Sequence, residues 1–344
     1  MSKTINHKLS TLLNKNLRGK RGVIAVIGWF SEDDEAIVPF GNFGSHAPER
    51  TSFQIGSVTK LFTAILAGIF ANDHKLELQG KVGHYLELDS SSTVSNVVIE
   101  DTLTHHSGLP SAPKDLLGKY DHNNPYQHVS RERLMDYLNT YNKPINANHR
   151  FQYSNLGFSI VGLVLEAITG KTYQSLVSDE ICQPLGIEDL WITQPKDNIY
   201  LSPGAMKRKK ETPRWALNAI APAGGIDAHI LDMLKFAKAN LPGHPFYPRC
   251  EIAHQARRTI SKRMAVGLGW LITNHKGIGK LHSHNGATGG FNSFLGIHPA
   301  GRFGVVVLTN FRLTPFQELG LAMDPATVIG FEGLKFMAKK RHHA

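Results

Sequence analysis

The chain has 344 residues, of which 41% are hydrophobic and 19% are charged, and its formal net charge at pH 7 is +10. This length and composition fit an ordinary globular protein that folds as one large domain or as two interleaved subdomains. The positive charge would suit an anionic partner, but the basic residues are scattered and their densest run, at 207–210, is short. Because no helix-turn-helix, zinc-finger or RNA-binding pattern accompanies this run, we interpret it as a solvated loop and expect no nucleic-acid partner.

The cysteines and the N-terminal stretch limit the class further. Cys182 and Cys250 are too few for a disulfide framework, and we interpret both as structural, although the sequence does not say whether they pair. Residues 1–20 form a polar, basic segment without the apolar run of a signal peptide, and residues 23–30 are too short to span a bilayer. We therefore expect no membrane span and, as the chain is given, a cytoplasmic location, whereas a removed leader would imply a periplasmic or secreted protein.

The first part of the chain predicts a hairpin and then a helix. Residues 23–27 and 36–40 are β-branched, apolar runs separated by turn residues, which is typical of two paired strands. After Gly56, an apolar pattern with helical spacing begins at Ser57 and continues to about residue 70.

The middle of the chain predicts further helices. Residues 131–141 and 156–169 have helical patterns, and Gly170 follows the second as a C-cap. Residues 200–221 are polar, basic and broken by proline, which is typical of an insertion that covers a site, and another helical pattern runs from 223 to 240.

The last third predicts successive strands. These segments are 266–272, 280–284, 291–297 and 303–310, and a helical segment at 316–340 follows that we expect to be interrupted at Pro325. Strands at both ends with helices between them predict an α+β fold, in which an antiparallel sheet from the N- and C-terminal segments is flanked by helices and carries an inserted, mostly helical subdomain. After segment 1–20 we expect one domain over 20–344, with the sheet region at about 20–75 and 223–344 and the helical region at about 76–222.

Ser57 is followed three residues later by Lys60, at the start of the predicted helix. Positions i and i+3 of a helix share a face, so the lysine amine would lie beside the serine hydroxyl. A free serine hydroxyl is a poor nucleophile, and a desolvated, neutral lysine can act as its base. The alternative is a helix cap beside a solvated lysine. A second such pair, Ser111 and Lys114, lies among prolines and is predicted to be a loop.

Three short motifs then follow one another: Ser57-Val58-Thr59-Lys60, Tyr153-Ser154-Asn155 and His284-Asn285-Gly286. Their order resembles that of the serine β-lactamase and penicillin-binding protein superfamily, in its class C-like branch. Connecting stretches at 103–110, 182–186, 223–225 and 286–291 are similar to the family too, and the resemblance covers about residues 20–312. It implies a β-lactamase/transpeptidase-like fold and a serine hydrolase that needs no cofactor.

The resemblance implies a role for each of the first two motifs. Ser57 would attack a carbonyl carbon and hold the acyl group as an ester. Lys60 would take the serine proton or hold the field in which another base takes it, and Tyr153 would relay a proton to the leaving group. Which of Lys60 and Tyr153 is the base in each step stays open. Asn155 would bond a substrate amide, and its alternative is to cap the helix that starts at Leu156.

The third motif would lie on a strand at the edge of the cleft. His284 would donate to a substrate carboxylate or to the tyrosine oxygen, and Gly286 would let a substrate backbone approach closely. The N–H of Ala287 would join that of Ser57 in an oxyanion hole. His282 and His284 share a strand face and would suit a metal pair, but no further ligand is fixed nearby, so we expect no metal.

Several substrates fit the resemblance: an amide, an ester or a D-amino-acid peptide, with a β-lactam or a D-Ala-D-Ala peptide among them. Efficient class C β-lactamases carry lysine where this chain has His284, and a neutral histidine attracts a carboxylate less strongly. We therefore expect a hydrolase of DD-carboxypeptidase or esterase type. A class C-like β-lactamase and a non-catalytic penicillin-binding sensor or structural homologue stay open as alternatives, and so does the oligomeric state.

Overall fold

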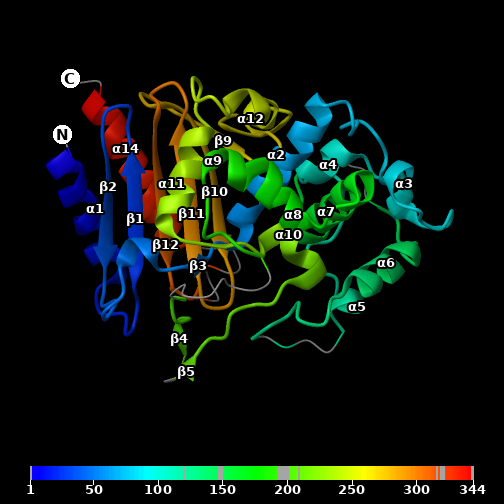
Figure 1. Cartoon of the computed structure of the whole chain (residues 1–344), viewed down its shortest axis with the longest axis horizontal. Helices are drawn as coiled ribbons and strands as arrows, with labels where there is room; N and C mark the ends of the chain where they lie inside the picture. The colour runs from blue at the N-terminus through cyan, green and yellow to red at the C-terminus, as the bar shows by residue number, and fades with distance from the viewer. Residues whose placement is uncertain are drawn as a thin grey trace.

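An antiparallel sheet formed by both ends of the chain is the centre of the computed structural model (Figure 1), which describes residues 2–118, 121, 123–145, 150–192, 201–207, 210–314, 317 and 322–341. Its strand order within these residues is β2-β1-β12-β11-β10-β9-β8-β7. The strands are β1 (Ala25–Phe30), β2 (Glu35–Phe40), β7 (Arg258–Ser261), β8 (Met264–Val266), β9 (Leu271–His275), β10 (Gly279–Ala287), β11 (Asn292–His298) and β12 (Phe303–Thr309). Ala25 lies opposite Thr309, so the N-terminal hairpin joins the C-terminal strands, as predicted.

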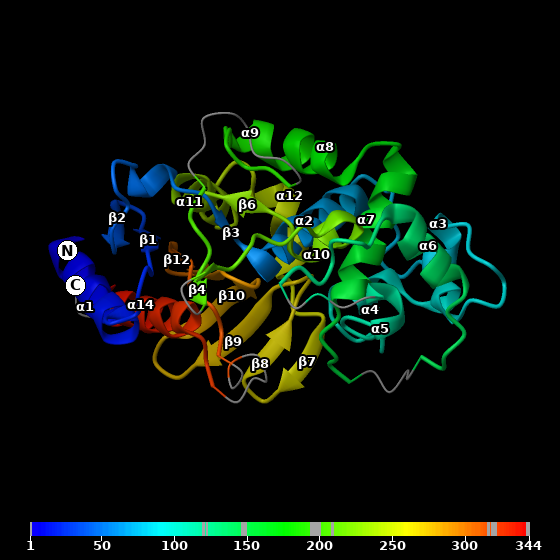
Figure 2. The same cartoon turned by 90° about the horizontal axis from the view of Figure 1, so that it is seen from below.

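Helices cover both faces of this sheet. On one face, α1 (Ser2–Leu17) and α14 (Pro325–Arg341) pack side by side and bury an apolar cluster against the strands (Figure 2). On the other face lie α2 (Thr59–Asn72), α11 (Ile230–Ala239) and α12 (Tyr247–His254), whose apolar residues form the larger core. Because the two sides of β1 face the two clusters, all of its residues are buried, which explains its continuous apolar sequence.

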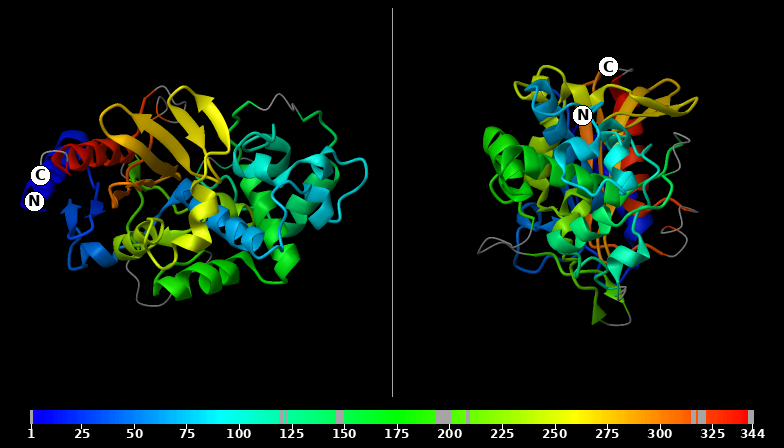
Figure 3. Two further views of the ribbon diagram at one scale, coloured as in Figure 1. Left: turned by 90° about the horizontal axis from the view of Figure 1, so that it is seen from above. Right: turned by 90° about the vertical axis from the view of Figure 1, so that its right-hand side faces the viewer.

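A helical region lies beyond one end of the sheet, opposite α1 and α14 (Figure 3). It contains α3 (Val82–Tyr85), α4 (Ile99–Leu103), α5 (Lys114–Leu117), α6 (Arg131–Asn139), α7 (Asn155–Thr169) and α10 (Ala221–Gly224). From this region α8 (Tyr173–Val177), a π-helical turn (Ser178–Cys182) and α9 (Gln183–Leu185) run back to α11. Short strand pairs join the parts: β3 (Phe53–Gln54) with β6 (Asp227–Ala228), and β4 (Met206–Lys207) with β5 (Lys210–Glu211). The domain boundaries given by the sequence stay predictions.

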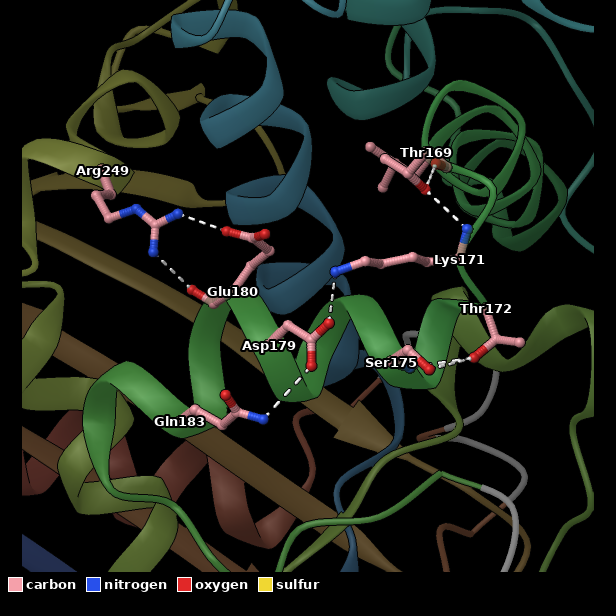
Figure 4. Close-up of polar contacts among 9 residues, drawn as sticks. Thr169, Lys171, Thr172, Ser175, Asp179, Glu180, Gln183 and Arg249 are labelled. Carbon is pink, nitrogen blue, oxygen red and sulfur yellow. Dashed lines mark hydrogen bonds and ion pairs between the residues drawn. The ribbon is translucent and has the colours of Figure 1, made fainter.

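Polar contacts fix the stretch from α8 to α9 against its surroundings (Figure 4). The Thr172 side chain caps α8, and Lys171 pairs with Asp179 at 2.7 Å. One residue further, Glu180 accepts a bond of 2.6 Å from Arg249 of α12. The helical region is thus tied to a helix that lies on the sheet.

The structure departs from the sequence-based elements in several places. Residues 1–20, which were expected only as a polar segment, contain α1. The apolar residues of this helix fall on one face, and the polar residues of the other face make its average composition polar. The strand predicted at 266–272 is two strands, because Gly269 (φ +71°) lies in a turn between β8 and β9. Pro325 begins α14, where its missing N–H costs nothing, rather than interrupting a helix. Residues 316 and 318–321 of that predicted helix lie outside the described residues.

Two other sequence-based interpretations are checked in part. Cys182 and Cys250 are both buried, as expected of structural cysteines. Of the basic run, Lys207 and Lys210 belong to β4 and β5, and residues 208 and 209 lie outside the described part of the chain.

The helices within the described ranges include none that combines the length and the apolar content needed to cross a membrane.

The packing of α1 predicts a measurable contribution to stability. Leu9 is 1% exposed and packs in the cluster between α1, α14 and the sheet. We expect Leu9→Ala to lower the free energy of unfolding by about 3 kcal/mol, through lost transfer free energy and a cavity. Lys15→Ala, an exposed change on the same helix, should alter it by less than about 0.5 kcal/mol. Denaturant titrations of the two variants measure the difference, and equal effects would contradict the packing of α1.

Candidate active site

Ser57 lies between strand β3 and helix α2, in a 3₁₀ turn over Gly56–Val58. Gly56 has φ +51°, a left-handed conformation that few other residues adopt without strain. A Cβ at Gly56 would also lie 2.6 Å from the backbone N of Ala287. The glycine therefore lets the turn press against β10, and Ser57 follows directly after this contact.

Lys60 is fully buried, with its Nζ 3.1 Å from the Oγ of Ser57. The same Nζ donates to Oδ1 of Asn155 at 2.8 Å and to the carbonyl oxygen of Ala223 at 2.6 Å. These partners come from α7 and α10, which lie beside α2 (Figure 2). Burial lowers the pKa of Lys60 well below its ordinary value, and no carboxylate within the described ranges pairs with it.

The hydrogen-bond partners of Lys60 determine where its lone pair points. A neutral amine has two hydrogens and one lone pair, and an amide or carbonyl oxygen can only accept. Asn155 and Ala223 therefore take the two hydrogens, which leaves the lone pair facing the Ser57 hydroxyl. This is the arrangement of a general base beside its nucleophile.

Tyr153 lies on the other side of the same serine. The Ser57 hydroxyl is hydrogen-bonded to its phenol, and burial raises the pKa of Tyr153 by more than this bond lowers it. The phenol therefore stays protonated and is suited to donate a proton rather than to remove one. Between the two bases that the sequence left open, the geometry favours Lys60.

Aromatic faces surround the amine. The ring of Tyr153 lies 4.7 Å from Nζ of Lys60, and the ring of Phe158 lies 5.5 Å from it. Ring faces attract cations, so they would stabilise the ammonium that forms when Lys60 accepts the serine proton.

Asn155 is the first residue of α7 and does not cap it. The N-cap is Ser154, whose Oγ accepts from the backbone N–H of Gly157 at 2.9 Å. The alternative of Asn155 as an N-cap is therefore wrong. Its side chain instead bridges Lys60 and Tyr126, to whose hydroxyl its Nδ2 donates at 3.2 Å.

His284 is buried on β10, with its ring centre 6.2 Å from that of Tyr153. Burial, and then the charge of Lys60, lowers the pKa of His284 to about 3. The ring is therefore neutral at pH 7. Its Nδ1 lies 2.6 Å from the carbonyl oxygen of Asn285, which can only accept, so Nδ1 carries the hydrogen and Nε2 is an acceptor. The expectation that His284 donates to a carboxylate or to the tyrosine oxygen does not hold for this tautomer.

His282, which with His284 formed the metal alternative, contacts another histidine. Nδ1 of His282 lies 3.0 Å from Nδ1 of His254, whose Nε2 lies 2.9 Å from Oδ1 of Asn240. These ring nitrogens are used within the protein. Over the ranges that the structure describes, no cluster of three or more His, Cys, Asp or Glu side chains is arranged to hold a metal ion.

Gly286 lies where β10 passes the backbone of Ser57. A Cβ here would come within 2.0 Å of the Ile55 carbonyl oxygen and 3.0 Å of the Ser57 N. The turn that carries Ser57 thus fills the space beside Gly286, for which the sequence suggested an approaching substrate. This contact brings the backbones of Ser57 and Ala287 together, as two oxyanion donors require, and their role as a hole stays a prediction.

A small cavity of about 30 Å³ adjoins Ser57. Tyr126 and Trp215 line it, with their rings edge to face at 5.8 Å. Gln54 holds Trp215 by donating to its carbonyl oxygen and accepting from its N–H, both at 2.9 Å. No sequence motif pointed to Gln54 or Tyr126, whereas Trp215 falls in the proline-broken stretch that was expected to cover a site.

The second serine–lysine pair shows none of these features. Lys114 is exposed at the start of α5, and Ser111 lies in the preceding loop, where its carbonyl oxygen accepts from the N–H of Leu156. The pair is therefore a structural loop, as its prolines indicated.

Comparison with known proteins gives sequence matches over most of the chain. A family model described as Beta-lactamase matches residues 22–323. The unguisins hydrolase ungD′ of Aspergillus campestris is 25% identical over 285 residues, which cover 76% of this chain and 52% of that protein. AmpH of Escherichia coli K12, a D-alanyl-D-alanine-carboxypeptidase/endopeptidase, is 25% identical over 291 residues, 77% of this chain and 73% of that protein. The chain spans about half the length of several curated relatives that it matches.

The solved structures agree on the architecture. A class C beta lactamase from Rhodobacter sphaeroides superposes with a TM-score of 0.80 at 20% sequence identity, covering 96% of this chain and 99% of that chain. Identity this low shows the fold alone, and it confirms the predicted sheet with flanking helices.

The buried amine of Lys60 predicts a pH dependence of stability. Its pKa is lowered on folding, so the unfolded chain binds the extra proton between that lowered value and the ordinary 10.5. Stability should therefore rise with pH across this window, by up to about 1.4 kcal/mol per unit. We expect the unfolding free energy of the wild type, minus that of Lys60→Met, to increase between pH 7 and pH 10. Parallel denaturant titrations test this, and a constant difference would contradict a neutral Lys60.

The close passage of β10 predicts a second effect. Gly286→Ala should displace the Ser57 turn and slow labelling of Ser57 by a fluorophosphonate by at least tenfold, since the Ile55 carbonyl oxygen blocks a Cβ. Gly157→Ala is the matched control, because a Cβ there would meet only ordinary contacts of 3.5 Å with Ser154 and Thr102. Equal labelling rates in the two variants would show that the backbone contact does not matter.

Proposed function

The chain belongs to the Beta-lactamase family, and from that premise we propose that it is a serine hydrolase that acts through an acyl-enzyme on Ser57. The observation that carries the proposal is the position of the buried Lys60, whose Nζ lies 3.1 Å from Oγ of Ser57 and is also bonded to Oδ1 of Asn155 and to the carbonyl oxygen of Ala223. A nucleophile with a base held in hydrogen-bond reach is the requirement for covalent catalysis by serine.

The reaction follows from the positions of these groups. Oγ of Ser57 forms a bond to the substrate carbonyl carbon while its proton moves to Nζ of Lys60. The N–H groups of Ser57 and Ala287 stabilise the oxyanion. When the bond to the leaving group breaks, the phenol of Tyr153 supplies the proton that the leaving group needs, and the ammonium of Lys60 passes its proton to the Tyr153 phenolate. Water then attacks the ester and gives a proton to Lys60, which returns it to Oγ of Ser57 as the acid is released.

The substrate class that we propose is an ester, an amide or a D-amino-acid peptide, as for a DD-carboxypeptidase or esterase. A neutral His284 offers no positive charge for a substrate carboxylate. The cavity of about 30 Å³ has room for a group the size of a methyl, such as that of an acetyl or D-alanyl residue. The similarity to AmpH, a D-alanyl-D-alanine-carboxypeptidase/endopeptidase, is in keeping with this class.

The test is turnover together with active-site labelling. We expect Ser57→Ala and Lys60→Ala each to lower kcat for p-nitrophenyl acetate by about 10³-fold or more, because the two groups act as a unit. Ser111→Ala, in the second serine–lysine pair, should leave it unchanged. A wild-type protein that gains no mass with a fluorophosphonate would sink the proposal.

The same preparation separates the alternatives. A panel of short-chain esters, D-Ala-D-Ala peptides and cephalosporins should show hydrolysis of the first two classes. Rapid turnover of nitrocefin would instead identify a β-lactamase, and a lasting penicillin adduct without turnover would identify a penicillin-binding sensor.

A further inference from the structure

His105 is a buried histidine next to the site that takes no part in the proposed reaction. It follows α4 in the left-handed conformation, with φ +61°, and its side chain is 1% exposed. Its ring centre lies 4.4 Å from that of Tyr153 and 5.1 Å from that of Phe158. A non-glycine residue in this conformation is held there by its surroundings.

The backbone and side chain of His105 hold both neighbours of Tyr153. Its carbonyl oxygen accepts from the N–H of Gln152 at 2.7 Å, and its Nδ1 accepts from the N–H of Ser154 at 3.1 Å. Tyr153 is therefore bracketed by two hydrogen bonds to one residue while its ring packs on the imidazole.

The rest of the loop after α4 strengthens this grip. The carbonyl oxygen of Pro110 accepts from Oγ of Ser154 at 2.8 Å, and that of Ser111 accepts from the N–H of Leu156 at 3.2 Å. The loop thus holds the whole approach to α7, and His105 supplies the part nearest the phenol.

The chemistry of the ring fits an acceptor. Burial, and then the charges of Lys60, His284 and His106, lowers the pKa of His105 well below its ordinary value. A neutral ring that accepts at Nδ1 carries its hydrogen on Nε2, which has no hydrogen-bond partner among the described residues. The ring thus accepts a hydrogen bond from Ser154 and packs against its neighbours. It exchanges no proton with the substrate in the reaction as proposed.

We propose that His105 is the positioning residue for Tyr153, holding the phenol against Ser57 so that it can protonate the leaving group. This inference rests on the proposed hydrolase function and adds a residue to it. His105 acts through the tyrosine and does not itself touch the substrate.

The proposal has a kinetic signature in the leaving group. A p-nitrophenolate departs as a stable anion, whereas an alkoxide must be protonated as it leaves, so only the second needs a well-placed acid. Loss of positioning should therefore slow an alkyl ester far more than its p-nitrophenyl counterpart. A general loss of structure would slow both alike.

The experiment compares ethyl acetate with p-nitrophenyl acetate. We expect His105→Leu to lower kcat for the ethyl ester by at least tenfold and kcat for the p-nitrophenyl ester by less than about threefold. Tyr153→Phe should show the same selectivity, and the double variant should lose little more than Tyr153→Phe alone, because the two residues serve one step. Equal losses on both esters, or additive losses in the double variant, would overturn the proposal.

Two conservative variants of His105 control for misfolding. His105→Asn keeps an acceptor close to the position of Nδ1 and should restore the ratio of the two rates, whereas His105→Gln places its acceptor further out and should not. If His105→Leu does not fold, as judged by thermal unfolding, this pair decides, and equal ratios in both would reject the proposal. His74→Leu is the matched control, since His74 is exposed and has a similar φ of +57°.

Fluorophosphonate labelling separates this proposal from the function on which it rests. Normal labelling of Ser57 in the wild type and in His105→Leu, without leaving-group selectivity, rejects only the role of His105. Absence of labelling in the wild type rejects the hydrolase itself.

Discussion

The arrangement of the site depends on the burial of one amine. An ammonium ion without a counter-charge is very costly to desolvate, so burial lowers the pKa of Lys60 and requires that the hydrogens of its amine be satisfied. Asn155 at the start of α7 and the carbonyl oxygen of Ala223 in α10 meet that demand. Three segments that are distant in sequence are thereby fixed around one nitrogen, and the serine hydroxyl is the partner left for its lone pair.

The same burial favours uncharged groups in the resting site. Desolvation lowers the pKa values of Lys60 and His284 and raises that of Tyr153, and in each case the shift is toward the neutral form. Charge then appears only as a substrate reacts, on the oxyanion and on Lys60.

Local patterns in the sequence were sufficient for the parts of the site that depend on spacing. Ser57 and Lys60 share a helical face, and the strand that carries His284 is recognisable from its apolar neighbours. The partners that tune these groups were not accessible in this way. The acceptor at Ala223 is a backbone oxygen, which any residue could supply, and the tautomer of His284 follows from the carbonyl group of Asn285. The amphipathic helix at 2–17 was missed because its average composition is polar, although its apolar residues recur at helical spacing.

The strand order of the sheet has a consequence for how the protein is made. Ser57 lies against β10, which pairs with β11, and β1 is enclosed by β12 from the far end of the chain. Contacts of such long range form late, because the entropy of closing a long loop must be overcome first. A partly synthesised or partly folded chain therefore carries an ordinary, unreactive serine. Ser57 would become reactive only when the whole sheet has formed. The rate at which Ser57 becomes open to labelling during refolding would therefore measure the rate of folding.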